Sequence, residues 1–350
     1  MKHVSIRDVA ALAGVSYQTV SKVLNGKGSV GPETRSRILQ CAVQLGYSPN
    51  ALARTLVTNR AFTIGIVASD LSDYVLAQFV VGAEREARRR GHATVIGTVD
   101  REGSDGELHL HRLIEHRVDG ILLAAPQMEE NPRVGEILRG KVPAVSIHHV
   151  PGGGISTVGS DHSQTGFLAT HHLVGLGHRR IGTITGPKNR RVTQSRLQGY
   201  RRALAAKDIP FDLALVEEGG LAAEDGYDAT CRLLARAPDT TAIFVHTDIM
   251  AVGVLSALHD LRRRVPEDCA VVGCDDVPFA AHLIPPLTTV RVPFYETGET
   301  ATRLLLDIIA NQPADPQRIL LPVTLIVRSS CGSVPSPISE EKIADGQDLN

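Results

Sequence analysis

The chain has 350 residues, of which 43% are hydrophobic, and its formal net charge is −1. The sequence contains no apolar run of about 18 residues, no signal peptide and no low-complexity tract, so a membrane-spanning or secreted protein is not expected. Five cysteines without a secretory signal or a CxxC pair predict buried, reduced thiols in a soluble cytoplasmic protein, and no metal site.

The charge is unevenly divided along the chain. Residues 1–60 contain eight Lys and Arg but only two acidic residues, a net charge of +6, which leaves about −7 for the rest. A basic segment attached to a mildly acidic body is the asymmetry expected of a protein that contacts nucleic acid through its N-terminal part.

Two short helices are predicted within this basic segment. Ser5 can cap a first helix whose third residue is Asp8, as in a capping box, and Gly14 then provides a tight turn. Ser16 can cap a second helix that begins at Tyr17. Two short helices joined by such a turn form a helix-turn-helix unit, whose second helix enters the major groove of DNA by its N-terminal residues.

The second predicted helix has a polar face that suits base reading. Its apolar residues are spaced for burial, and the opposite face carries Tyr17, Gln18, Ser21 and Lys22. Gln can pair with adenine through two hydrogen bonds, and Lys can reach guanine or a phosphate. An ordinary amphipathic surface helix is the alternative interpretation.

A third helix is predicted to start with Pro32 in its first turn and to end at Gly46. Three helices in about 46 residues can close a small core. We expect the buried face of the third helix to consist of Ile38, Leu39, Ala42 and Val43.

The next segment, "SPNALARTLVTNRAF", has a helical composition from Asn50 to Val57, but this covers only about two turns. An isolated helix of that length is marginal in water, because nucleation costs more than so few hydrogen bonds return. On composition alone, a stiff spacer is equally compatible with this segment.

From about Ala61 onward, short apolar runs alternate with amphipathic stretches. Helices are expected at Tyr74–Arg90, near 107–116, through "SRLQGYRRALAAK" and near 249–262. Apolar runs that are buried on both faces and separated by helices predict parallel sheets in α/β layers, and about 290 residues suit two such sheets better than one. The runs are "FTIGIVAS", "ATVIGTV", "GILLAAP", "PAVSIH", "RRIGTITGP", "TAIFVHTD" and "CAVVGCDD".

Polar residues follow several of these runs. Ligands of open α/β sheets bind at the carboxyl ends of the strands, so these residues are candidate ligand contacts. Carboxylates combined with an arginine suit a polyol, because each hydroxyl group both donates and accepts a hydrogen bond. A structural ion pair is the alternative for each. The candidates are Asp70, Asp73, Tyr74, His148, His149, Asp161, Arg196, Thr247, Asp248, Asp275 and Asp276.

The stretch "IRDVAALAGVSYQTVSKVLNGKGSVGPETRSRILQCAVQLGYSPNALARTL" resembles the N-terminal domain of the LacI/GalR family of bacterial transcriptional regulators. The resemblance implies a hinge helix that orders when two copies meet in the minor groove, with Leu56 as the wedge that kinks the duplex. It implies DNA contacts from Ser5, Ser16, Tyr17, Gln18, Ser21, Lys22, Asn25, Tyr47, Asn50, Ala53 and Leu56.

The body is similar to the effector-binding core of the same family, which has the periplasmic sugar-binding-protein fold. The similarity rests on "LGHRRIGTITGP", "VVGCDDVPFAAHLIPPLTTVRVPFYETG" and "LPVTLIVRSS". The implied α/β fold has a three-helix helix-turn-helix domain at 1–48, a hinge helix and linker at 49–60, a two-lobed core of parallel sheets flanked by helices at 61–332, and a flexible tail at 333–350. Lobe one would comprise about 61–160 and 293–321, and lobe two about 161–291 and 322–331.

The resemblance also implies that an effector binds between the lobes, in direct contact with Arg196 and Asp275. Leu221 stands where many members carry a stacking aromatic, Thr247 where Asn is common and His148 where Asp is common. These departures weaken the expectation of an aromatic sandwich around the ligand. The implied effector contacts are Asp73, Tyr74, His148, Arg196, Thr247 and Asp275.

The expected function is that of a homodimeric, cytoplasmic transcriptional regulator that binds a palindromic operator in double-stranded DNA. We expect a repressor of a sugar or related catabolic operon, controlled by a small-molecule effector that is a carbohydrate inducer, with no cofactor and no membrane partner. Two alternatives stay open: a repressor of the purine type, which needs a corepressor, and a regulator that both activates and represses. An enzyme is not expected, because no GxGxxG follows a strand and neither GxxxxGK[ST] nor GxSxG is present.

Overall fold

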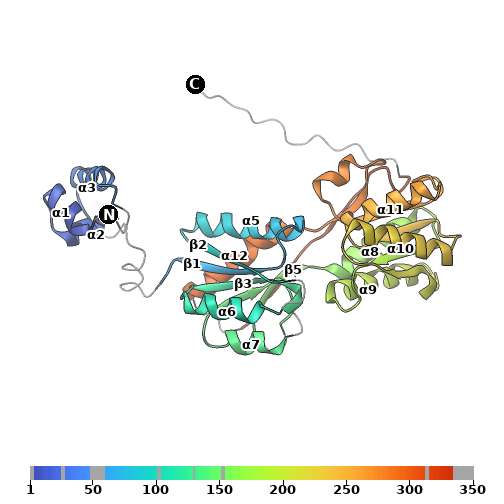
Figure 1. Cartoon of the computed structure of the whole chain (residues 1–350), viewed down its shortest axis with the longest axis horizontal. Coiled ribbons are helices and arrows are strands. Elements are labelled where there is room, and N and C mark those ends of the chain that lie inside the picture. Colours follow the sequence, from blue (N-terminus) through green and yellow to red (C-terminus); the bar gives the residue numbers. More distant parts are fainter. Residues whose placement is uncertain are drawn as a thin grey trace, which may run out of the picture. The chain divides into compact units, whose positions relative to one another are not determined.

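The computed structural model describes residues 4–24, 28–47, 60–100, 104–128, 131–150, 154–311 and 315–333. The chain forms two compact units, Met1–Thr63 with Arg117–Asp119, and Ile64–His116 with Gly120–Asn350; Figure 1 shows their elements. No helix in these described ranges is long and apolar enough to cross a membrane. The whole of the predicted hinge helix, 50–57, and the tail after Ser333 lie outside the described residues.

The N-terminal unit contains the three predicted helices: α1 (Ile6–Ala13), α2 (Tyr17–Leu24) and α3 (Pro32–Gln44). The Asp8 carboxylate accepts hydrogen bonds from the backbone N–H and the hydroxyl of Ser5, so the start of α1 is fixed as the sequence predicts. Gly14 ends α1 at a φ of 66°, a conformation that favours glycine. The Ser16 hydroxyl accepts from the Thr19 N–H at 3.2 Å and so caps α2.

The buried face of α3 differs from our expectation. Ile38, Cys41 and Ala42 are buried against α1 and α2, whereas Leu39 is 44% exposed and Val43 82% exposed. Because successive helical residues are rotated by about 100°, the stripe at i, i+3 and i+4 from Ile38 faces the core and each residue one position further turns away from it. The prediction that Leu39 and Val43 are buried is therefore wrong.

The second unit contains two six-stranded sheets. Their spatial orders, β11-β5-β4-β3-β1-β2 and β12-β10-β9-β8-β6-β7, follow the same topology, and each takes an edge strand from the C-terminal part of the chain. The strands pair in parallel from β1 through β3, β4 and β5 to β11, and from β7 through β6, β8 and β9 to β10, whereas β10 and β12 are antiparallel. The first sheet is formed by β1 (Thr63–Ala68), β2 (Ala93–Thr98), β3 (Gly120–Ala124), β4 (Ala144–Ser146), β5 (Ser156–Ser160) and β11 (Arg318–Leu321). The second is formed by β6 (Ile181–Thr185), β7 (Val216–Glu218), β8 (Ala242–Val245), β9 (Ala270–Asp275), β10 (Thr288–Arg291) and β12 (Thr324–Ile326).

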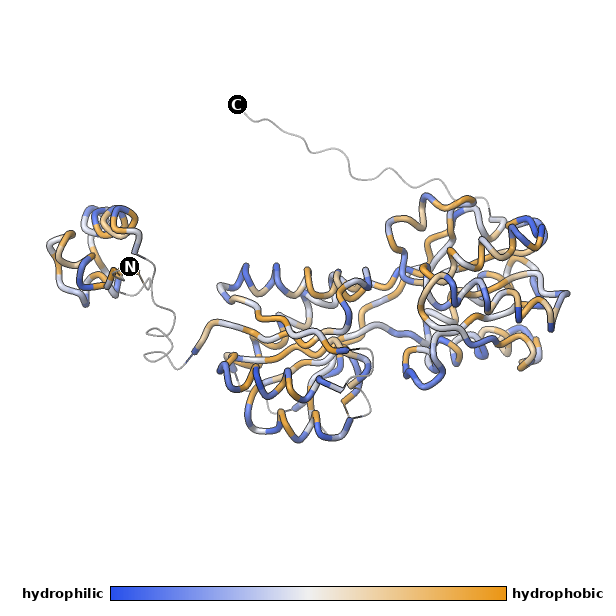
Figure 2. The backbone as a smooth tube through the Cα atoms, viewed as in Figure 1, coloured by the Kyte–Doolittle hydropathy of each residue, from blue (hydrophilic) through white to orange (hydrophobic). Residues whose placement is uncertain are grey.

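Helices cover both faces of each sheet, which gives the three layers of an α/β domain. We call each sheet with its helices a lobe. Figure 2 shows the strands mostly in hydrophobic colours and the helices in alternating ones, as amphipathic helices require. In lobe one, the pair α5 (Tyr74–Arg89) and α12 (Phe294–Asn311) lies on one face and the pair α6 (Gly106–Glu115) and α7 (Pro132–Leu138) on the other. In lobe two, the pair α8 (His162–Gly175) and α9 (Arg191–Ala205) lies opposite the pair α10 (Ala223–Arg236) and α11 (Asp248–Asp260). Short 3₁₀ turns lie at Pro126–Met128, Leu213–Leu215 and Pro278–His282.

Three of these helix pairs approach each other closely at glycines. A Cβ atom added to Gly199 of α9 would overlap the carbonyl oxygen of Ser163 in α8, and one added to Gly166 of α8 would overlap that of Arg196 in α9. The same reciprocal contact joins α5 to α12 and α10 to α11. The two other pairs use Gly82 with Gly298, and Gly226 with Gly253.

One strand is less buried than its sequence suggests. The run "ATVIGTV" forms β2, but Val95 and Ile96 in it are exposed. Because β2 is an edge strand of the first sheet, it has no neighbour on its outer side and its side chains are less well covered than those of central strands. The other runs form strands of the two sheets, and the predicted fold class is confirmed; the residues at which one domain ends and the next begins stay a prediction.

The chain passes between the lobes three times. It leaves lobe one after β5 to enter α8, returns after β10 to form α12, and passes again from β11 to β12. Thr324 at the start of β12 pairs with Arg291 at the end of β10. The second passage therefore leaves lobe two next to the point where the third passage enters it.

Candidate functional site

The predicted reading face of α2 is available for contacts. Tyr17 is 52% exposed, Gln18 and Lys22 are also exposed, and Ser21 is partly buried. Val20 and Val23, on the other side of the helix, are buried in the core of the three-helix unit. The helix therefore has a buried apolar side and a largely exposed polar side near its N-terminus, as an element that enters a groove requires.

The remaining DNA-contact candidates differ in what the structure says of them. The hydroxyls of Ser5 and Ser16 are exposed but already bond within the unit, to Asp8 and to the Thr19 N–H. Tyr47 is half-buried against the core of the unit, just beyond α3. The other candidates, Asn25, Asn50, Ala53 and Leu56, lie outside the described residues.

Arg196 and Asp275 form a buried ion pair in lobe two. Arg196 lies on α9 and Asp275 ends β9, and Arg196 Nη2 lies 3.2 Å from Asp275 Oδ1 with both side chains almost fully buried. Arg196 Nη1 also donates to the carbonyl oxygen of His246, which follows β8. The pair thus joins the carboxyl ends of two neighbouring strands, where α/β sheets bind ligands.

The Asp275 carboxyl is set apart by its environment. Burial raises its pKa above the usual range, the Arg196 guanidinium and the Cys274 thiol oppose that rise, and the Asp73 carboxylate adds to it. Its backbone has a φ of 112°, which non-glycine residues adopt rarely and at an energetic cost. Strained backbone at a buried charged residue is typical of a binding site.

Two histidines beside this pair were missed by the sequence reasoning. Both ring nitrogens of His246, Nδ1 of His162 and Nε of Arg196 are buried without a hydrogen-bond partner among the described residues. Burial, and then the charge of Arg196, lowers the pKa of both histidines well below its usual value, so each ring is neutral and offers one donor and one acceptor. The position of His246 directly before Thr247 was the available signal.

Asp248, the first residue of α11, is fully buried beneath the same site. Its carboxylate accepts hydrogen bonds from the Thr289 hydroxyl at 2.7 Å and from the Val277 N–H at 3.0 Å. Burial, with the Asp275 charge, raises the pKa of its carboxyl. Since its oxygens already accept hydrogen bonds inside lobe two, Asp248 stabilises the structure around the site.

The other effector candidates are less directly connected. Asp73 caps α5 by accepting from the Val75 N–H at 3.0 Å, and burial raises the pKa of its carboxyl. Its charge reaches Asp275, as that of His148 reaches His162, so the structure brings both lobe-one candidates within electrostatic range of lobe two. Thr247 caps α11 by accepting from the Met250 N–H, and Tyr74 is partly exposed at the start of α5.

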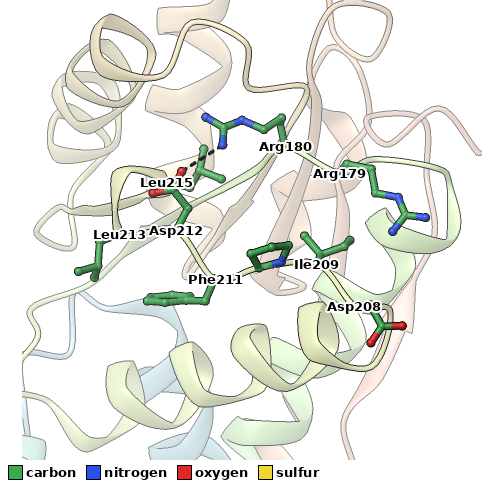
Figure 3. A pocket seen from close by; sticks show the side chains of 9 residues that line it. Arg179, Arg180, Asp208, Ile209, Phe211, Asp212, Leu213 and Leu215 are labelled. Carbon is green, nitrogen blue, oxygen red and sulfur yellow. Dashed lines mark hydrogen bonds and ion pairs between the residues drawn. The ribbon is translucent and has the colours of Figure 1, made fainter.

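A pocket of about 650 Å³ lies elsewhere in lobe two (Figure 3). It is lined by the loop between α9 and β7 and by Arg179 and Arg180, just before β6. Arg180 points toward Asp212 and bonds to it across one side of the pocket. None of the predicted effector residues lines it, and it lies at the amino end of β6, whereas Arg196 and Asp275 lie at the carboxyl ends of the strands.

Comparison with known proteins identifies both units. Residues 5–50 match the lacI family of bacterial regulatory proteins, and residues 170–331 match a periplasmic binding protein-like domain. The transcriptional regulator CelR of Thermobifida fusca is 39% identical over 92% of this chain and 96% of its own. The chain belongs to the LacI family of bacterial regulators. This LacI-family chain is therefore a DNA-binding transcriptional regulator under small-molecule control, and the relatives are regulators rather than enzymes.

Solved structures extend the similarity to the whole chain. The lac repressor dimer bound to operator and the anti-inducer ONPF has a TM-score of 0.85 and 32% identity, covering 94% of this chain and 99% of that one. The complex of CelR with cellobiose has a TM-score of 0.72 and 37% identity, covering 93% of this chain and 99% of that one. The predicted family and its helix-turn-helix and periplasmic-binding-protein-like parts are confirmed.

Proposed function

We propose that this LacI-family regulator is a homodimeric repressor whose operator affinity is lowered by a carbohydrate bound beside Arg196 and Asp275. A regulator of chromosomal genes in bacteria acts in the cytoplasm, and we assign it to that compartment. Among sugars we favour a disaccharide of the cellobiose type, because CelR, which shares 39% identity, has a cellobiose complex among its solved structures.

The observation that carries the proposal is the group of polar atoms around Arg196. A buried ion pair lies at the carboxyl ends of the strands together with Nε of Arg196, Nδ1 of the neutral His162 and both ring nitrogens of the neutral His246. Within the described part of the chain, none of these four buried nitrogens has a hydrogen-bond partner. Leaving such buried donors and acceptors unsatisfied is costly. A polyhydroxylated ligand supplies alternating donors and acceptors and would relieve that cost, with Asp275 and Arg196 gripping neighbouring hydroxyls.

Homodimer formation is supported by exposed apolar side chains in both lobes. Ile284 in lobe two is 94% exposed, and the edge strand β2 in lobe one exposes Val95 and Ile96. The similar lac repressor is a dimer bound to operator, and we expect these apolar side chains to be covered in a corresponding contact between copies. Two copies would present two α2 helices to the two halves of a palindromic operator.

The test measures sugar binding and DNA binding on the same protein. We expect cellobiose to bind the full-length protein in calorimetry and to lower its affinity for an operator recovered from a random DNA library. Arg196→Ala should abolish the cellobiose signal and keep the operator affinity measured without sugar, because Arg196 lies on α9 and not in the DNA-contact unit. Arg232→Ala, which breaks an exposed ion pair with Glu217 in the same lobe, is the matched control.

The outcome also decides between inducer and corepressor. Guanine and hypoxanthine are included as probes, since a purine that tightens operator binding would replace the sugar proposal with a corepressor mechanism. If Arg196→Ala binds cellobiose as well as the unmodified protein does, the proposed site is wrong.

A further inference from the structure

The residue after Asp275 connects the effector site to other parts of lobe two. The carboxylate of Asp276 is only 6% exposed and binds two arginines, with Arg291 at 2.7 Å from Oδ2 and Arg328 at 2.6 Å from Oδ1. The two arginines belong to different strand ends: Arg291 ends β10, and Arg328 lies two residues beyond β12. We call these three residues the Asp276 clasp.

The strand register places the clasp where the chain passes between the lobes. Asp275 pairs with Arg291 in the parallel ladder of β9 and β10, and Arg291 pairs with Thr324 in the antiparallel ladder of β10 and β12. Beyond Arg291 the chain continues into α12 of lobe one, and before Thr324 it arrives from β11 of lobe one. Asp275, the start of the passage after Arg291 and the end of the passage before Thr324 therefore lie next to one another across the second sheet.

The backbone at the clasp needs support from its surroundings. Asp275 and Asp276 are consecutive non-glycine residues with φ values of 112° and 56°. Conformations of this kind persist only where neighbouring contacts hold them. The two ion pairs of Asp276 supply such contacts, and they fix the turn that directs the Asp275 carboxylate toward Arg196.

The two arginines are held differently. Arg328 is held inside lobe two by two hydrogen bonds. Its Nη1 donates to the Leu287 carbonyl oxygen, and its backbone N–H donates to the Thr288 hydroxyl. The Arg291 side chain is 57% exposed, and its guanidinium binds Asp276 Oδ2 through both Nε and Nη2. A movement of the passage that starts at Arg291 would therefore be transmitted to Asp276, while Arg328 stays in place.

From this geometry we propose that Asp276 is a positioning residue that couples effector binding at Asp275 to the passages between the lobes, through its ion pair with Arg291. The proposal rests on the effector-controlled function proposed above. It differs from a purely structural role, because loss of the Arg291 contact is expected to leave the fold and the ligand contacts intact and to weaken the communication between ligand and DNA.

The test uses the full-length protein with Arg291→Ala, with Arg291→Lys as the conservative variant and Arg264→Ala as control. Arg264 forms an exposed ion pair with Asp268 in the same lobe and does not touch the clasp. Calorimetry measures cellobiose affinity, anisotropy measures operator affinity with and without cellobiose, and hydrogen–deuterium exchange follows peptides covering 274–277, 291–295 and 321–326.

For Arg291→Ala we expect cellobiose affinity and sugar-free operator affinity within about twofold of the unmodified protein, and a change in operator affinity on adding cellobiose that is at least about threefold smaller. Arg291→Lys should recover part of that response, because a lysine keeps one charged contact but not the planar fork. Exchange should become faster in the three peptides of Arg291→Ala and stay unchanged in Arg264→Ala.

An unchanged cellobiose response in Arg291→Ala, or equal losses of cellobiose and operator affinity together with a lower melting temperature, overturns the proposal. If the unmodified protein does not respond to cellobiose, the sugar assignment fails, and the exchange experiment still decides on the clasp: unchanged exchange in all three peptides refutes it. Asp276→Asn, which leaves both arginines without their partner, should reproduce the exchange pattern more strongly.

Discussion

Tyr17 and Gln18 occupy the first two positions of α2, and both side chains are exposed. A solvated helix surface gains most from charged pairs along the helix, and neither residue carries a charge. Both have hydrogen-bonding groups that match base edges in the major groove. At the scale of single residues, we expect these two side chains to determine the choice of operator.

Replacing Tyr17 and Gln18 together by Ala should remove the preference for the selected operator over random DNA. Each good base contact contributes about 1–3 kcal/mol of discrimination, whereas the salt-dependent affinity for any DNA comes from phosphate contacts and should change little. Anisotropy titrations at several salt concentrations measure both quantities. Gln40→Ala on the exposed side of α3 is the control, and a double variant with unchanged discrimination would refute the reading role.

The titration of the Asp275 carboxyl predicts how the affinity for the effector depends on pH. Burial raises the pKa of its carboxyl, so it takes up a proton at a higher pH than an ordinary Asp, and the protonated form pairs poorly with Arg196. Cellobiose affinity should therefore fall as the pH is lowered from 8 to 5. For stability the sign is opposite. Between about pH 4, where an unfolded Asp titrates, and about 6, the raised pKa of Asp275 in the fold, the folded chain holds a proton that the unfolded chain has released, so the free energy of unfolding falls as the pH rises through this window.

Calorimetry at pH 8, 7, 6 and 5 checks the effect on binding. Asp275→Asn should bind more weakly and with a flatter pH profile, because its amide does not titrate. The lowered pKa values of His162 and His246 keep both rings neutral over most of this range. A profile in Asp275→Asn as steep as that of the unmodified protein would assign the titration to another group.

How much of the site could be predicted depends on where its residues lie in the chain. Arg196 and Asp275 follow from the family resemblance, and Asp275 also from its position at the end of a strand; the structure brings them together in one ion pair. The clasp could not be found in this way. The role of Asp276 depends on its pairing with Arg291 and Arg328, which are 15 and 52 residues away.

At the scale of elements, the three closely packed helix pairs share one type of contact. In each pair a glycine on either helix lies against the backbone of the other, as Gly166 and Gly199 do between α8 and α9. This contact sets how near α9, which carries Arg196, lies to α8. Alternation of apolar runs and helices predicts such elements, but the exposed side chains of β2 and the buried stripe of α3 depend on neighbours that the sequence does not specify.

Gly199→Ala should destabilise the protein by about 1–3 kcal/mol or more, because its Cβ overlaps backbone that cannot rotate away. Urea unfolding followed by circular dichroism measures the loss. Gly175→Ala is the matched control at the end of α8, where a Cβ meets nothing within 4 Å, and it should be neutral or slightly stabilising. Equal stability of the two variants would contradict the close packing of α8 and α9.

At the scale of the whole molecule, we expect function to depend on two copies of the chain. A palindromic operator offers two half-sites, and one helix-turn-helix unit reads one of them. Ile284 is the most exposed large apolar side chain among the described residues, and it belongs to lobe two. We expect it to lie in the contact between copies.

Ile284→Asp should shift the protein toward monomers, since it places a charge in an apolar contact, and should weaken operator binding by at least about tenfold through loss of the second half-site. Sedimentation velocity at several concentrations measures the oligomeric state. Leu213→Asp, an exposed leucine beside the pocket of Figure 3, is the control. A dimer of undiminished stability in Ile284→Asp would place the interface elsewhere.

The late position of β11 and β12 in the chain has a consequence for synthesis on the ribosome. The first lobe has made its first five strands by Ser160, but it lacks α12 and β11 until Leu321 has been added. At ordinary elongation rates this interval lasts roughly 10–30 s. Throughout it, the nascent first lobe exposes the unpaired edge of β5 and the side of α5 that α12 later covers. Unpaired strand edges and exposed apolar faces favour aggregation, so we expect the growing chain to need protection by chaperones until its last strands emerge.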